Sequence, residues 1–217
     1  MDQIRYYVCY RQSNVKMVAV GTGYAYRPLG TSHHRTEDLG MLRTVPGLIV
    51  TAPSDPGEVE GLTNYFCNHD GPGYMRLRKN GEPLVYPLRP IFEVPQALSV
   101  LEGEETVVFS TGAMLYEAVS FARQQRPTWG RMSFPFVKPL DLAMVKKACL
   151  SYQTVVTIEE HQLAGGFESA VFEAINDLRT SEQHAVHPMV KRIGIPDAFS
   201  HESGSQKFLK QRMQIRM

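Results

Sequence analysis

Residues 48–77 read LIVTAPSDPGEVEGLTNYFCNHDGPGYMRL, and no other stretch of the chain constrains the fold as strongly. The apolar run at 48–51 predicts a buried β-strand, and the run at 74–77 predicts a second one. Between them, Asp55 can cap a helix, because proline occupies the first helical position and a glutamate follows three residues after the cap. This helix would run to about Asn68. A strand, a helix and a strand in this order predict parallel strands joined by a right-handed crossover.

The same alternation continues on both sides of this stretch. Apolar residues recur at helical spacing from Ile4 to Val8, so the chain is expected to begin in a helix. The run at 15–20 predicts a buried strand, and Thr36 can cap a short helix that ends near Pro46. Downstream, the sequence predicts strands at 106–110, 130–134, 154–158 and 189–193 and helices at 114–125, 140–148 and 166–178. This order predicts an α/β protein with mainly parallel sheets flanked by helices.

A proline-rich stretch divides the chain into two small domains. Residues 81–103 contain four prolines that break any regular element, as in a semi-rigid interdomain linker. The first domain is therefore placed at 1–80 and the second at 104–200. The tail at 201–217 is polar and basic, and no regular element is predicted there.

The composition is that of an ordinary globular protein. The 217 residues are 43% hydrophobic, and 23 Lys and Arg residues almost balance 22 Asp and Glu residues. This balance gives no electrostatic reason to expect a nucleic acid or an anionic membrane as a partner, and no apolar run is as long as a spanning helix. The three cysteines are widely spaced, which indicates neither a disulfide framework nor a zinc site. Together with the lack of a recognisable leader, they favour the reducing cytoplasm.

A polar loop at 30–39, GTSHHRTEDL, follows the first predicted strand. Open α/β sheets bind ligands at the carboxyl ends of their strands, so this loop is a candidate binding site. His33 and His34 are neighbours and point in different directions in an extended loop, so they cannot chelate one metal ion together. In one interpretation, one histidine packs and the other is solvated. In the other, the pair and its neighbouring hydroxyl groups hydrogen-bond a polar ligand.

Several motifs occur together in an order that has a known counterpart. Residues 26–34 read YRPLGTSHH, residues 43–46 read RTVP, and residues 52–55 read APSD. Taken in order, these motifs resemble the pyrimidine-binding domain of the transketolase family, which uses thiamine diphosphate. Later segments, including VVTIEEH at 155–161, resemble the C-terminal domain of the same family. The resemblance implies an incomplete thiamine-diphosphate pyrimidine-binding fold followed by a transketolase C-terminal-like fold.

The resemblance also implies a set of substrate-binding residues. His33 falls on the histidine that contacts the substrate in the family, His34 follows it, and Ser32 keeps the hydroxyl group of the usual threonine. Arg78 follows the third strand, where family members place an arginine on the sugar phosphate, and Arg43 is the second candidate for that role. A guanidinium suits a phosphate because it donates two parallel hydrogen bonds. The alternative is that both arginines are simply solvated at the ends of their elements.

The second domain offers a weaker candidate site. Gly165 and Gly166 allow a tight turn into a helix whose free N–H groups could receive an anion. The resemblance favours a different interpretation, because this domain is chiefly an assembly element in the family. Glu160 and His161 are therefore expected to have a mainly structural role.

Two parts of the family's machinery have no counterpart in the sequence. No Gly-Asp-Gly with a downstream Asn is present, which is the element that holds magnesium and the diphosphate, and the activating glutamate would precede Met1. Glu37 and Asp38 follow the histidine loop and are not assumed to replace that glutamate. The resemblance thus implies thiamine diphosphate and Mg²⁺ only in an assembly with an N-terminal transketolase-like subunit that carries the diphosphate site. The chain alone is expected to be inactive.

Three hypotheses about function remain. The first is the C-terminal part of a transketolase-like enzyme that transfers a two-carbon ketol unit between sugar phosphates, within a homo- or hetero-oligomer. The second is a non-catalytic remnant or assembly module. The third is a related enzyme, either a 1-deoxyxylulose-5-phosphate synthase or the beta subunit of a 2-oxo-acid dehydrogenase. The Tyr-x-Pro-Leu-Gly motif at 26–30 and the histidine pair favour the first.

Overall fold

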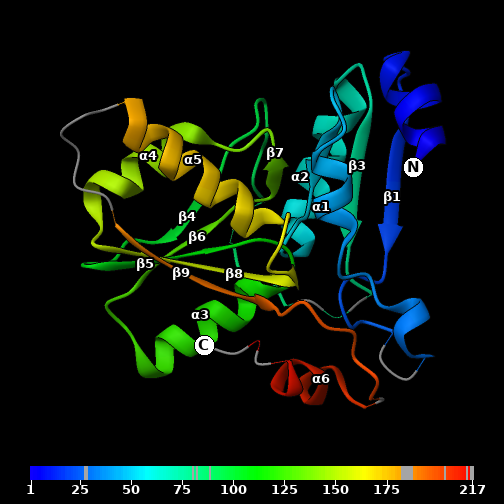
Figure 1. Cartoon of the computed structure of the whole chain (residues 1–217). Coiled ribbons are helices and arrows are strands. Elements are labelled where there is room, and N and C mark those ends of the chain that lie inside the picture. The colour runs from blue at the N-terminus through cyan, green and yellow to red at the C-terminus, as the bar shows by residue number, and fades with distance from the viewer. Residues whose placement is uncertain are drawn as a thin grey trace.

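The computed structural model describes residues 1–26, 29–79, 81, 83–87, 89–181, 188–202, 204–213 and 215. The chain forms two α/β units that lie side by side, and each is built on its own sheet (Figure 1). Parallel pairs dominate both sheets, so the predicted α/β class is confirmed. Arg27 and Pro28 of the loop motif lie outside the described residues. Within the described part of the chain, no helix is long and apolar enough to cross a membrane.

The first sheet contains four strands in the order β1 (Lys16–Val20), β3 (Gly73–Leu77), β2 (Ile49–Thr51) and β7 (Phe136–Lys138). The first three are parallel, and α1 (Asp38–Arg43) and α2 (Pro56–Asn68) connect them. The Asp55 side chain accepts the backbone N–H of Glu58, so the predicted cap of α2 is confirmed. The order strand, helix, strand within residues 48–77 is also confirmed.

Strand β7 comes from the second half of the chain and completes the first sheet. It pairs antiparallel with β2, and the amide of Ala52 donates to the carbonyl of Pro135. The sequence predicts no strand here, because three residues between two prolines carry no periodicity. The first sheet therefore depends on residues of the second unit.

The second sheet contains five strands in the order β4 (Leu98–Leu101), β6 (Gly130–Ser133), β5 (Thr106–Ser110), β8 (Thr154–Gln162) and β9 (Met189–Ile195). Helices α4 (Leu142–Ser151) and α5 (Phe167–Ser181) cover one face, and α3 (Met114–Gln125) covers the other (Figure 1). Val107 and Phe109 of β5 pack in the core cluster that contains residues of α4 and α5, whereas Val108 packs with residues of α3. The central strand is thus buried on both faces, as its apolar sequence predicts.

Strand β1 differs from its prediction. The sequence predicts burial, but Val18 is 57% exposed and Val20 is 41% exposed. The reason is position: β1 is the end strand of the sheet, and its apolar sequence does not reveal that it lies at an edge. The predicted cap of α1 is also wrong, because Thr36 donates its hydroxyl to Glu37 and no side chain caps the helix.

Two segments without predicted elements contain regular structure among their described residues. The stretch at 81–103 contains β4 and lies against α2, where the backbone N–H of Val85 donates to Asp55. The tail contains α6 (Gln206–Arg212), which buries Leu209 and the following Ile215 against α3 and the second sheet. Its apolar residues are too few to show a periodicity by themselves, and their partners are distant in the sequence.

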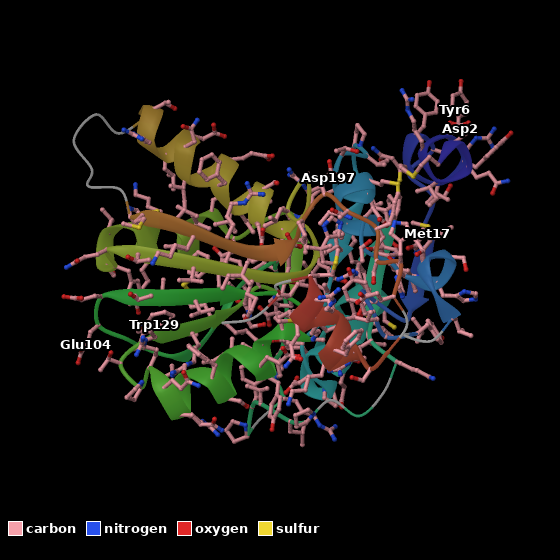
Figure 2. All side chains as sticks on the ribbon, turned by 60° about the horizontal axis from the view of Figure 1, so that its bottom comes forward. Asp2, Tyr6, Met17, Glu104, Trp129 and Asp197 are labelled. Atoms are coloured by element: carbon pink, nitrogen blue, oxygen red, sulfur yellow. The ribbon has the colours of Figure 1, made fainter. Side chains whose placement is uncertain are left out.

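The chain begins with η1 (Gln3–Tyr10), a helical segment with π-type hydrogen bonding. The predicted helical start is confirmed, although the π geometry is not foreseen by the sequence pattern. Ile4, Val8 and Cys9 face the core, while Tyr6, Tyr7 and Tyr10 are 61%, 61% and 77% exposed. In Figure 2, Tyr6 points away from the rest of the molecule.

Candidate functional site

Three loops meet at one edge of the first sheet. Because β1, β2 and β3 are parallel, the segments that follow them all leave from the carboxyl ends of the strands. These segments contain the histidine loop after β1, the turn at 52–55 after β2, and Arg78 and Lys79 after β3. This edge is where open α/β sheets bind ligands.

Tyr26 links two of these loops. Its ring centroid lies 6.4 Å from that of His33, and the Lys79 ammonium lies 5.3 Å from the Tyr26 centroid. Gly21, with φ of 94°, makes this arrangement possible, because a Cβ there would lie 1.9 Å from the Tyr26 ring. The structure therefore places the histidine loop beside the residues that follow β3.

The two histidines separate, as their adjacency predicts. His33 is exposed, and its Nδ1 lies 3.0 Å from the Ser32 hydroxyl, so this contact within the loop uses one of the two ring nitrogens. His34 turns inward, where its ring meets Tyr24 edge-to-face at 4.9 Å. His33 and Ser32 thus expose polar atoms at the surface, while His34 packs against Tyr24.

The Arg78 side chain lines two cavities. The first, of about 340 Å³, lies at the ends of β2 and β3, and Lys79 and Ser54 also line it. The second, of about 520 Å³, lies between α3 and α6. Arg78 donates to Gln206 Oε1 at 2.9 Å, so α6 holds one side of the guanidinium. Two adjacent cationic side chains at the mouth of the first cavity can bind an anion such as a phosphate.

The structure does not bring Arg43 to this cavity. Its guanidinium donates to both carboxylate oxygens of Glu173 on α5 and to the carbonyl of Gly165. Arg43 therefore joins α1 to the second unit.

Three described carboxylates near the edge, Glu37, Asp38 and Glu58, make hydrogen bonds within the chain. Burial alone would raise the pKa of Asp38, but the Arg76 guanidinium at 3.1 Å and the Tyr74 hydroxyl at 2.6 Å outweigh it, so the pKa lies below its usual value. Glu37 accepts both the N–H and the hydroxyl of Thr36. Burial raises the pKa of Glu58 to about 7, and its carboxylate accepts bonds from Ser54 and Tyr86.

These contacts bear on whether the chain can hold thiamine diphosphate. Glu37 and Glu58 accept hydrogen bonds from neighbouring residues, and Asp38 pairs with Arg76 through Oδ2, while its Oδ1 is buried without a hydrogen-bond partner among the described residues. In the described ranges, no three or more His, Cys, Asp or Glu side chains are grouped so that they could hold a metal ion. The residues present do not fit a complete cofactor site.

Two buried residues of β8, Glu160 and His161, form hydrogen bonds with residues of the first unit. Glu160 accepts the backbone N–H of Tyr24 at 3.0 Å, and both of its oxygens accept Gln206 Nε2 at 2.9 Å. His161 is fully buried, its Nε2 accepts the N–H of Gly40, and its Nδ1 contacts the carbonyl of Gln162. The predicted structural role of both residues is supported by these contacts, which fasten the loops of the first unit to β8.

At the glycine turn before α5, the free N–H groups of the helix start bind a side chain of the same chain. The Glu159 carboxylate accepts the backbone N–H groups of Phe167 and Glu168 at 3.0 and 2.9 Å. A Cβ on Gly166 would lie 2.5 Å from that carboxylate. The chain's own glutamate therefore occupies this helix start, which agrees with a structural role for the turn.

Sequence reasoning missed three residues of the edge: Tyr26, Lys79 and Gln206. Lys79 could have been found, because it extends a run in which three of four residues at 76–79 are basic. Tyr26 opens the Tyr-x-Pro-Leu-Gly motif, which could have pointed to it, whereas Gln206 reaches the site only through tertiary packing and no local pattern marks it.

Comparisons with known proteins agree with this architecture. The family model of the transketolase pyrimidine binding domain matches residues 1–82, and that of the transketolase C-terminal domain matches residues 96–215. The chain is 29% identical over 213 residues to one of the subunits of the apulose-4-phosphate transketolase of Actinobacillus succinogenes, covering 96% of this chain and 66% of the relative. It is 33% identical over 217 residues to 1-deoxy-D-xylulose-5-phosphate synthase 1 of Geobacter sulfurreducens, covering 96% of this chain and 32% of the relative.

A solved structure described as a split gene transketolase, an inactive beta4 tetramer, is similar with a TM-score of 0.86 and 26% identity. The match covers 99% of this chain and 67% of that chain. The chain spans 62% to 66% of the length of the apulose-4-phosphate transketolase subunits of Phocaeicola vulgatus and Actinobacillus succinogenes to which it is similar. The two domain matches, in family order and over nearly the whole chain, show that the chain belongs to the transketolase family.

Proposed function

We propose that this chain supplies the sugar-phosphate contacts of a thiamine-diphosphate-dependent enzyme that transfers a two-carbon ketol unit. The observations that carry the proposal are that Tyr26 lies between His33 and Lys79, and that Lys79 and Arg78 line one cavity at the carboxyl edge of the first sheet. A hydroxyl-rich phosphorylated ligand needs such a combination of a hydrogen-bonding imidazole and paired cations.

Each residue has a distinct part in this proposal. His33 hydrogen-bonds a sugar hydroxyl, and Ser32 orients its ring through the bond to Nδ1. Arg78 binds the phosphate, and Lys79 adds a second positive charge. His34 supports the loop from below by packing on Tyr24. Arg43 remains the second candidate for the phosphate, but its bonds to Glu173 would first have to break.

The cofactor is proposed to come with a partner. The described residues do not fit a complete site for thiamine diphosphate and Mg²⁺, so we assign the diphosphate site to an N-terminal transketolase-like subunit. The apulose-4-phosphate transketolase relatives support this assignment, because a protein named as one subunit of an enzyme implies another. The chain is proposed to be inactive alone, to act within a homo- or hetero-oligomer, and to reside in the cytoplasm, where its free cysteines stay reduced.

The test is an assay of ketol transfer with the chain alone and mixed with a subunit that carries the diphosphate site. We expect turnover only in the mixture. Arg78→Ala should raise KM for phosphorylated substrates about tenfold or more, because it removes a charge-assisted hydrogen bond. Arg123→Ala, an exposed arginine of α3, is the control. Equal KM values for the two variants would remove Arg78 from the site.

Two other functions remain alternatives. The engaged carboxylates favour a non-catalytic assembly module, which would bind a partner without conferring turnover. The 33% identity to a 1-deoxy-D-xylulose-5-phosphate synthase favours a related reaction of the same family. Comparing pyruvate with a ketose phosphate as the donor in the same mixture separates these possibilities.

A further inference from the structure

Gln206, at the start of α6, bridges two side chains of opposite charge. Its Nε2 donates to both carboxylate oxygens of Glu160 at 2.9 Å, and its Oε1 accepts a hydrogen bond from the Arg78 guanidinium at 2.9 Å. The Gln206 side chain is only 5% exposed, so the loss of either bond would leave a buried polar group unsatisfied. Both ends of this amide are therefore needed where they lie.

The chemistry of the two neighbours calls for an amide at this position. An ionised carboxylate only accepts hydrogen bonds, and a guanidinium only donates them. A glutamate at position 206 would turn a like charge toward Glu160, and a lysine would turn a like charge toward Arg78. An amide carries a donor and an acceptor without a charge, so its two partners fix its orientation. The carbonyl end of Gln206 thus holds the guanidinium in one direction.

Glu160, the anchor of this amide, is itself fixed from several sides. It lies in β8, the longest strand of the second sheet, and is 3% exposed. The buried Lys210 ammonium lies 3.5 Å from its Oε2 and supplies a counter-charge. The backbone of Gly23 packs directly against the side chain, since a Cβ there would lie 2.5 Å from the Glu160 Cδ. We therefore expect this carboxylate to move little.

The same carboxylate also reaches the histidine loop. Its Oε1 accepts the backbone N–H of Tyr24 at 3.0 Å, and the Tyr24 ring packs edge-to-face on His34. Glu160 is thus linked to the histidine loop directly and to Arg78 through Gln206. A ligand that contacts both a histidine and an arginine needs a fixed spacing between them, and supporting hydrogen bonds behind the binding residues provide it.

We propose that Gln206 is a positioning residue, which holds the Arg78 guanidinium at the spacing from the histidine loop that a phosphorylated sugar requires. It acts through Arg78 and does not itself contact the ligand. A guanidinium that is held in advance loses less rotational freedom on binding, so its affinity for a phosphate rises. The assignment of Arg78 to a sugar phosphate rests on the proposed function, whereas the link from Glu160 through Gln206 to Arg78 does not.

The first test uses the full chain alone, with inorganic phosphate as the probe and the NMR signals of the Arg78 guanidinium as the readout. In the wild type, we expect this group to rotate more slowly than that of Arg123, which is exposed on α3. Gln206→Met keeps the side-chain length and should weaken phosphate binding about fivefold, the effect of one lost hydrogen bond. Gln211→Met, at an exposed position of the same helix, is the matched control and should bind as the wild type does. Equal rotation of the two arginines, Arg78 signals that do not respond to phosphate, or equal affinities of the wild type and a folded Gln206→Met each overturn the proposal.

The second test is a double-mutant cycle in the ketol-transfer assay with a subunit that carries the diphosphate site. Gln206→Met alone should raise KM for a ketose phosphate about fivefold and leave kcat unchanged. Combined with Arg78→Ala, it should add nothing, because its effect passes through Arg78. An additive rise in KM would indicate a general structural effect and overturn the proposal. Phosphate binding that depends on Gln206, in a mixture that shows no ketol transfer, would defeat the proposed function and leave the positioning role intact.

Discussion

The two sheets of the molecule differ in how completely the chain covers them. The second sheet has helices on both faces, and its central strand β5 is buried from Val107 to Ser110. The first sheet receives β7 from the second unit on one side but ends at the exposed strand β1 on the other. The closed sheet provides stability, and the open sheet carries the candidate ligand edge. Measurements of stability and of amide exchange test this difference between the sheets.

The largest effect is expected in the closed sheet. Phe109 is fully buried, with its ring centroid 4.5 Å from that of Phe134. Phe109→Ala should lower the free energy of unfolding by about 3–5 kcal/mol, because it leaves a cavity in the core. Val18→Ala on the open strand should change it by less than about 0.5 kcal/mol. Urea denaturation measures both, and similar losses would contradict the contrast.

The next effect concerns a buried ion pair within the first unit, whose arginine also hydrogen-bonds to the second unit. Arg76 is 4% exposed, pairs with Asp38 at 3.1 Å and donates to the carbonyl of Glu160. Asp38→Ala should cost about 3–5 kcal/mol, because it leaves a buried guanidinium without its counter-ion. Asp177→Ala, at an exposed position of α5, is the control. A cost below about 1 kcal/mol, seen by calorimetry, would show that this buried pair contributes no more than an exposed one.

A pH effect is expected at α2. Burial raises the pKa of Glu58 from 4.5 to about 7, so the folded chain holds this proton more tightly than the unfolded chain. Stability from this group is fully present below pH 4.5 and falls as the pH rises toward 7, by roughly 3 kcal/mol in total.

Urea midpoints between these pH values measure the slope. Glu58→Gln should flatten it, while Glu93→Gln at an exposed position should leave it in place. A slope that survives in Glu58→Gln would assign the pH dependence to another group.

The smallest effect concerns the second link between the units. Glu173 is 57% exposed, so its pair with Arg43 is screened by water. Glu173→Gln should cost less than about 1 kcal/mol and should lose its effect at a salt concentration of about 1 M. A cost as large as that of Asp38→Ala would contradict this, because the exposed pair would then contribute as much as the buried one.

Local signals explain which parts of the fold could be predicted from the sequence. Asp55 and Pro56 predict the start of α2, and the apolar run of β5 predicts a buried strand, because caps and burial act through neighbouring residues. Strand β7 and helix α6 are not predicted from local signals, since their partners lie far away in the sequence. Likewise, the apolar sequence of β1 does not indicate that this strand lies at the end of the sheet with exposed side chains.

The same division holds for the candidate site. His33 and Arg78 are found through the resemblance to a family, and the structure places both at the carboxyl edge of the first sheet. Tyr26 is part of the motif that carries the resemblance, but only the folded chain shows its contact with His33, and Gln206 lies beside Arg78 only in the folded chain. Their roles in binding remain predictions that the ketol-transfer assay tests.

Residue-resolved amide exchange of the chain alone tests the contrast between the sheets most directly. We expect the amides of Val107, Val108 and Phe109 to exchange only through global unfolding, and those of Val18 and Val20 to exchange orders of magnitude faster. Equal protection of both strands in the monomer would contradict the view that the first sheet is open at β1.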